Sequence, residues 1–135
     1  MTPWRFGKKK NPHKYGAKSG DGFGSKLESA VHGILQLRER NGEISNIQRQ
    51  QTVVLQDGAR DVRITWRVDF SFTDTATGTT IYCEAKGFET SDYKLKLKMW
   101  RKLKPHTLEI YKGSYTRPVL VEKILKDDTQ TQGAS

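Results

Sequence analysis

Cysteine and histidine are scarce in this chain of 135 residues. Cys83 is the only cysteine, which excludes a disulfide within the chain and a zinc site made of cysteines. His13, His32 and His106 lie far apart and lack the spacing of metal ligands, so a catalytic site built on zinc or histidine has little support. Any catalytic chemistry must therefore come from other side chains.

Long hydrophobic runs are also missing. No apolar stretch approaches the length of a membrane-spanning helix, and the N-terminus lacks the apolar centre of a signal peptide. We therefore expect a cytoplasmic protein. The chain length suits one domain, since single domains commonly hold about 100 to 150 residues.

Acidic residues are few relative to basic ones. Asp and Glu number 15 against 24 Lys and Arg, which gives a formal net charge of +9. A positive surplus of this size in a small domain favours a polyanionic partner, most often nucleic acid. Composition alone does not separate an enzyme that acts on nucleic acid from a protein that only binds it.

Glycine and lysine dominate residues 1–24, which we interpret as a flexible basic arm. The arm either follows a phosphate backbone or is simply solvated. Its lysines are Lys8, Lys9, Lys10, Lys14 and Lys18. Residues 25–125 carry periodic hydrophobic patterns and form the expected folded domain, and residues 126–135 are a polar tail that we expect to be disordered.

Two helices and several strands are predicted between these ends. Ser25-Lys26-Leu27-Glu28 has the spacing of a capping box, so a helix should begin there and end near Asn41-Gly42. A second helix is expected over 93–103, after a cap within 87–92 and before Pro105. Strand patterns cover 43–47, 51–56, 64–72 and 81–86, with further short strands near 107–111 and 119–121.

The second predicted helix has a strongly basic exposed face. This face either contacts the backbone of a nucleic-acid duplex or is an ordinary solvated surface, and contact is the interpretation that the net charge favours. Its basic residues are Lys94, Lys98, Arg101 and Lys102.

The most informative stretch is a predicted hairpin of two hydrophobic strands. The polar, glycine-containing segment 74–79 joins residues 67–72 to residues 81–86. If 75–78 form the loop and Asp74 faces Thr79, counting back along both strands places Asp69 opposite Glu84. The other face of the hairpin is then apolar and holds Cys83, where an inert buried thiol is expected.

Carboxylates that face each other across a sheet normally destabilise it, and in the same register Arg67 would face Lys86. One interpretation places a divalent cation between the carboxylates and a phosphate near the basic side chains, as metal-assisted phosphodiester hydrolysis requires. The alternative is a solvated face on which Arg67 pairs with Glu84 and Asp69 pairs with Lys86. Glu28 also has two interpretations: it caps the first helix, or it is a third carboxylate at the site.

The order of these motifs resembles the PD-(D/E)XK nuclease superfamily: a glutamate in a first helix, a strand with Val68-Asp69, then Glu84-Ala85-Lys86 and a helix. More closely, five segments resemble a family of small phage and prophage nucleases that is similar to archaeal-type Holliday junction resolvases. These segments are KYGAK (14–18), SKLE (25–28), GEISN (42–46), VDFSF (68–72) and EAKGF (84–88). The proline of the superfamily name is absent, since Val68 precedes Asp69.

This resemblance implies an α/β fold like that of restriction endonucleases, with a mixed sheet of four or five strands flanked by helices in an αβββαβ core. It implies Asp69 and Glu84 as the main ligands of Mg²⁺, which Mn²⁺ can replace, and Glu28 as a further ligand, direct or through water. Lys86 would orient or activate the attacking water. The polar residues that could assist are Gln48, Gln50 and Ser71.

The function that the resemblance implies is hydrolysis of phosphodiesters at four-way DNA junctions during recombination, by a homodimer in the host cytoplasm. The arm lysines, Arg67 and the basic face of the second helix would bind the DNA. Two alternatives stay open: a nuclease of this superfamily with a nicking, end-processing or restriction-like activity, and a basic binding module without catalysis. Asp69 and Glu84 favour an enzyme, because a pure binder gains nothing from carboxylates that repel phosphate.

Overall fold

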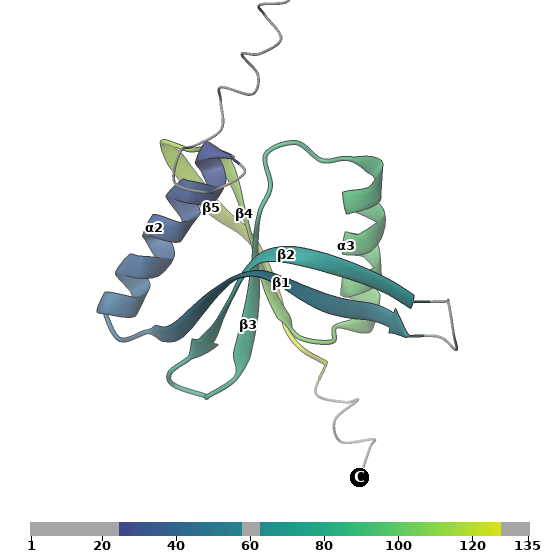
Figure 1. Cartoon of the computed structure of the whole chain (residues 1–135), viewed down its shortest axis with the longest axis horizontal. Helices are drawn as coiled ribbons and strands as arrows, with labels where there is room; N and C mark the ends of the chain where they lie inside the picture. The colour runs from purple at the N-terminus through teal and green to yellow at the C-terminus, as the bar shows by residue number, and fades with distance from the viewer. Residues whose placement is uncertain (1–24, 58–62, 128–135) are drawn as a thin grey trace, which may run out of the picture.

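Five strands form one mixed sheet with a helix on either side (Figure 1). The computed structural model describes residues 25–57 and 63–127. The elements in chain order are α2 (Lys26–Arg40), β1 (Ile44–Asp57), β2 (Arg63–Asp74), β3 (Thr80–Ala85), α3 (Ser91–Leu103), β4 (Thr107–Ser114) and β5 (Arg117–Ile124). The predicted α/β class and mixed sheet are confirmed. The basic arm of residues 1–24 and all but the start of the polar tail lie outside the described residues.

The sheet has the order β1-β2-β3-β4-β5. Neighbouring strands are antiparallel except for β3 and β4, which are parallel and are connected through α3. The predicted order αβββαβ is present, and β5 follows it at the sheet edge. Among the described residues, no helix is both long and apolar enough to cross a membrane.

Both helices begin and end where their capping residues predict. The Ser25 hydroxyl accepts a hydrogen bond of 3.0 Å from the backbone N–H of Glu28, and the chain leaves α2 at Gly42, whose φ of 81° favours glycine. The Thr90 hydroxyl accepts from the N–H of Tyr93 at 3.1 Å at the start of α3. Lys104 then adopts a left-handed conformation, with φ 45°, and Pro105 prevents continuation of the helix.

One long strand, β1, replaces the two separate strand segments that the sequence indicated. Asn46 and Gln50 have positive φ values of 55° and 54°, and the register with β2 shifts between Ser45 and Gln48. Such irregularities interrupt the hydrophobic alternation without ending the strand. The polar residues between the two predicted segments are therefore part of β1.

Two hydrophobic clusters fill the spaces between the helices and the sheet. One joins α2 to Phe70, Phe72, Ile81 and Cys83, and the other joins α3 to Trp66, Val68, Leu108 and Ile110. Burial raises the pKa of the Cys83 thiol, so it remains a protonated core side chain as predicted.

The two clusters divide one face of β2 between them. Side chains alternate along a strand, so Trp66, Val68, Phe70 and Phe72 share a face, yet the first two pack with the α3 cluster and the last two with the α2 cluster. The division falls at Asp69. The end of the β1–β2 hairpin thus extends past the body of the sheet towards α3, as Figure 1 shows.

A buried ion pair fastens α2 to β4. Glu109 is 1% exposed, and its Oε1 accepts a hydrogen bond of 2.8 Å from Arg38 Nη1, which also donates to the Tyr111 hydroxyl at 3.3 Å. The Arg38 guanidinium lies over the Phe72 ring, 5.1 Å from its centroid. Because a buried carboxylate without a partner is costly, Arg38 should be needed to offset the burial of Glu109.

We predict that Arg38→Met lowers the free energy of unfolding by about 3 to 5 kcal/mol, because it leaves the buried Glu109 carboxylate without its main partner. Urea denaturation at neutral pH would measure this loss. Lys96→Met is the matched control, since it breaks the exposed pair with Asp92 at a cost below about 1 kcal/mol. If Arg38→Met/Glu109→Leu is no more stable than Arg38→Met, the stranded carboxylate is not the cause.

Candidate active site

The β2–β3 hairpin has the register that its turn predicts. Phe70 pairs with Cys83, Ser71 with Tyr82, Phe72 with Ile81 and Thr73 with Thr80. The N–H of Asp74 donates to the carbonyl of Thr79 at 2.8 Å and closes the loop. This register brings Asp69 and Glu84 to the next opposed position along the two strands.

At that position, hydrogen bonds to side-chain carboxylates take the place of the backbone hydrogen bonds between β2 and β3. The backbone N–H of Asp69 donates to Glu84 Oε1 at 3.2 Å, and the backbone N–H of Ala85 donates to Asp69 Oδ2 at 2.9 Å. The predicted pairing of Arg67 with Lys86 is wrong, because β3 ends at Ala85 and the ladder stops at Phe70. The two carboxylates thus accept hydrogen bonds from backbone N–H groups that would otherwise have no partner where the strands separate.

Lys86 lies beside the carboxylates at the end of β3. Its Nζ is 3.2 Å from Glu84 Oε2 and 4.9 Å from the centroid of the Tyr93 ring. Among the described residues, neither diagonal pair of the alternative interpretation, Arg67 with Glu84 or Asp69 with Lys86, is formed as an ion pair. The arrangement is therefore a compact group of two acids and one base rather than a solvated face of alternating charges.

Glu28 reaches the site from the first turn of α2. It is 6% exposed, and its Oε2 accepts a hydrogen bond of 3.1 Å from Gln50 Nε2. Gln50 lies on β1 between two residues that pair with Phe70 and Val68, which brings it beside Asp69. Of the three assisting residues considered from the sequence, Gln50 is thus the one hydrogen-bonded to a predicted site residue.

The conformation of Gln50 supports a special role for this position. A positive φ is uncommon for a residue other than glycine, and backbone strain of this kind is frequent at functional sites. Gln48, by contrast, donates to Asn46 Oδ1 at 2.9 Å on the exposed surface, and Ser71 is buried in the ladder.

Burial and a neighbouring carboxylate raise the pKa values of both acids. Burial raises the pKa of Asp69 to about 6; the Ala85 N–H opposes this rise, and the Glu28 carboxylate adds to it. Burial also raises the pKa of Glu84 to about 8, the Asp69 carboxylate adds to the rise, and Lys86 opposes it. The site therefore favours added positive charge.

Arg49 is a contributor that the sequence analysis missed. It lies on β1 next to Gln50, and its charge lowers the pKa of Asp69. Nothing in its sequence context distinguishes it from the other exposed bases. Only the pairing of β1 with β2 reveals its proximity to the acids.

The donor set consists of carboxylate oxygens, which suit a hard divalent cation. Across residues 25–57 and 63–127, no group of three His, Cys, Asp or Glu side chains is arranged so that it could hold a metal ion. Asp69 and Glu84 form a close pair, whereas Glu28 is held by Gln50. The three-residue ligand set of Asp69, Glu84 and Glu28 stays a prediction.

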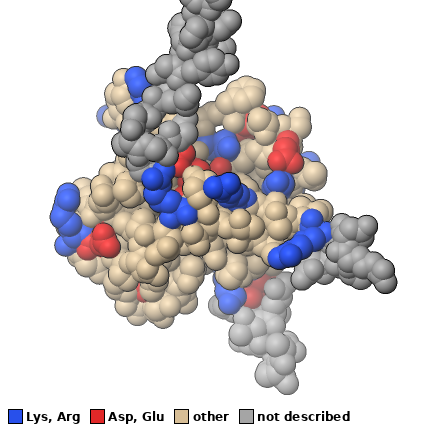
Figure 2. All heavy atoms as spheres, viewed as in Figure 1, with Lys and Arg blue, Asp and Glu red and all other residues tan. Residues whose placement is uncertain are grey.

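The other predicted DNA-binding residues are spread over the surface. Arg67 is exposed on β2, and Lys94, Lys98 and Lys102 are exposed on α3. Arg101 is already engaged, since it forms two hydrogen bonds with Glu122 at 2.7 and 2.9 Å. On the face seen in Figure 2, basic side chains lie around a small patch of acidic atoms. The arm lysines lie outside the described residues.

Comparison with known proteins gives no family for this chain. No protein-family model and no curated protein matches it. The crystal structure of a protein called SSO0001 is similar over 76% of this chain, with 16% sequence identity and a TM-score of 0.39. The chain spans 55% of the length of that protein.

We predict that stability falls as pH rises through the site's titration range. A carboxyl group whose pKa is raised in the folded state stabilises it below the ordinary value of about 4 and loses this contribution as pH passes the folded value. The free energy of unfolding should therefore fall from about pH 4 to about pH 8, by on the order of 3 kcal/mol, and level off once Asp69 and then Glu84 have ionised in the folded state.

Urea denaturation at several pH values would measure this dependence. Glu84→Gln should flatten the profile, while Glu39→Gln, which removes an exposed carboxylate from α2, should retain the wild-type slope. A wild-type profile without a decline, or an unchanged decline in Glu84→Gln, would contradict the assignment.

Proposed function

We propose that this protein is a metal-dependent, structure-specific DNA endonuclease with a fold related to that of restriction endonucleases, and that its substrate is the four-way Holliday junction. The observation that carries the proposal is the group formed by Asp69, Glu84 and Lys86 where β2 separates from β3. A buried acid, a half-buried acid and one base on a chain of net charge +9 match the needs of phosphodiester hydrolysis better than those of passive binding.

The carboxylates account for the proposed cofactor. Asp69 and Glu84 would hold Mg²⁺, or Mn²⁺ in its place, and Glu28 would add a direct or water-mediated contact. Their burial and raised pKa values mean that bound positive charge relieves an existing repulsion. Such a cation would supply Lewis-acid activation of the phosphate and of the attacking water.

Lys86 lies beside the acids that would hold the cation. Its ammonium lies 3.2 Å from Glu84 Oε2 and 4.9 Å from the centroid of the Tyr93 ring. From this position Lys86 would orient the attacking water and stabilise negative charge that develops on the phosphate. Gln50 would keep the Glu28 carboxylate turned towards the acids.

The remaining basic residues would hold the substrate. Arg67 and the exposed lysines of α3 would contact backbone phosphates, together with the lysines of residues 1–24. A junction is resolved by two symmetric cuts, so we also propose that the protein acts as a homodimer that supplies two active sites. The homodimer is inferred from the two cuts that junction resolution requires.

Cleavage of an immobile four-way junction tests the proposal. Wild-type protein with Mg²⁺ should make paired, symmetric cuts, while EDTA, Asp69→Asn and Lys86→Ala should abolish cutting and leave junction binding within about threefold of wild type, because these groups act on the reaction rather than on the DNA backbone. Gel electrophoresis would resolve the products, and linear duplex and single-stranded DNA serve as comparison substrates.

The comparison substrates separate the alternatives. Metal-dependent cutting of linear duplex or DNA ends would retain the nuclease site and reject the junction as substrate. Absence of metal-dependent cutting in every DNA, with tight binding, would identify a binding module. If Asp69→Asn and Lys86→Ala lost binding to the same degree as cutting, their catalytic roles would be rejected.

A further inference from the structure

A cavity of about 360 Å³ lies between α3 and strands β4 and β5. Its apolar wall is formed by Leu97, Ile110 and Val121. The remaining lining side chains are charged apart from Tyr93, and they come mainly from one face of α3. The volume lies within the range of sites that bind small ligands or parts of larger ones, which begins at about 300 Å³.

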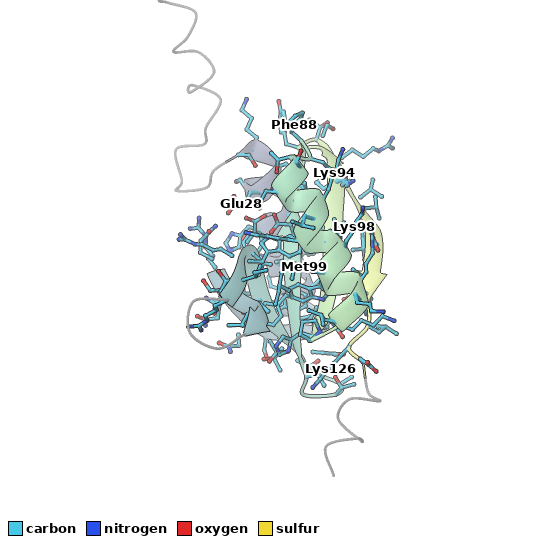
Figure 3. The ribbon with its side chains drawn as sticks, turned by 90° about the vertical axis from the view of Figure 1, so that its right-hand side faces the viewer. Glu28, Phe88, Lys94, Lys98, Met99 and Lys126 are labelled. Atoms are coloured by element: carbon cyan, nitrogen blue, oxygen red, sulfur yellow. The ribbon has the colours of Figure 1, made fainter. Side chains whose placement is uncertain are left out.

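The cavity carries positive charge that has no internal partner. Arg101 is paired with Glu122, and Lys112 is paired with Glu89. Lys94 and Lys98, one helical turn apart, form no ion pair within residues 25–57 and 63–127. Figure 3 shows both lysines on the side of α3 that faces β4 and β5. The cavity thus suits an anion.

Tyr93 lines the same cavity and carries a buried hydroxyl without a hydrogen-bond partner among the described residues. The residue as a whole is 4% exposed. Buried polar groups in folded proteins are nearly always hydrogen-bonded, so this hydroxyl needs an explanation. Burial, together with the Glu84 and Glu122 carboxylates, raises the pKa of Tyr93 to about 12, which keeps the hydroxyl protonated and able to donate.

The Tyr93 ring also connects the cavity with the candidate active site. Lys86 Nζ lies 4.9 Å from the ring centroid, while Tyr93 lines the cavity with Arg101 and Glu122. A single side chain thus separates Lys86, which would act on the scissile phosphate, from the positively charged cavity.

We infer that this cavity binds a backbone phosphate of the DNA strand next to the phosphate that is cut, with the Tyr93 hydroxyl donating to a phosphate oxygen and Lys94 and Lys98 neutralising its charge. This inference rests on the proposed function for its choice of DNA. Free inorganic phosphate presents the same chemistry, so the test includes it as a separate probe.

The test measures binding without cleavage. Fluorescence anisotropy of a labelled four-way DNA junction in EDTA gives the Kd at several salt concentrations for the full chain. Tyr93→Phe keeps the ring that contacts Lys86 and removes only the donor, so it should weaken DNA binding about tenfold without lowering Tm. Lys98→Gln should reduce the slope of log K against log salt by about 0.9.

Lys126→Gln is the matched control, because it removes one lysine charge at the end of the molecule far from Lys94 and Lys98 (Figure 3). It should leave the Kd within about twofold and the salt slope unchanged. Wild-type binding by Tyr93→Phe would overturn the inference. Calorimetric binding of inorganic phosphate that Tyr93→Phe abolishes, with unchanged DNA binding, would overturn the choice of DNA.

Failure of this inference is distinguishable from failure of the proposed function. If the wild-type protein cuts DNA and Tyr93→Phe binds DNA normally, the phosphate site in the cavity is rejected and the nuclease function is retained. Weakened binding by Tyr93→Phe in a protein that cuts no DNA would keep the phosphate site and remove the enzyme.

Discussion

Two carboxylates, one buried and one half-buried, accept backbone hydrogen bonds across the break in the β2–β3 ladder, and the rest of the site follows from this constraint. The Asp69 carboxylate accepts a hydrogen bond from the N–H of Ala85, and the Glu84 carboxylate accepts one from the N–H of Asp69. The strands can therefore separate without leaving these backbone N–H groups unpaired. The same contacts hold two like charges together in a region of low polarity. Lys86 offsets part of that cost, and a bound cation would offset more.

The two hydrophobic clusters maintain this break. The buried residues of β2 before Asp69 pack with the α3 cluster, and those after it pack with the α2 cluster. The two helices therefore pack on opposite sides of the position where the strands part. The Arg38–Glu109 pair fixes α2 against β4, which in turn fixes Glu28 at the start of α2. Stability and site geometry are therefore linked through the positions of the helices.

The sequence predicted those features that depend on local chemistry. Turn length sets the hairpin register, which gave the opposition of Asp69 and Glu84, and capping residues gave both helices. It did not predict features that depend on distant segments. The end of the ladder at Phe70, the contact of Gln50 with Glu28 and the engagement of Arg101 by Glu122 arise from tertiary packing. The cavity beside Tyr93 is of the same kind, since three elements form it.

The most direct test of this account is the location of Mn²⁺ by anomalous diffraction from crystals soaked at pH 8. The account predicts a peak in contact with the carboxylates of Asp69 and Glu84, and its loss in crystals of Asp69→Asn. Absence of Mn²⁺ from these carboxylates in the wild type, or an unchanged peak in the variant, would contradict the claim that this pair of acids is a metal centre.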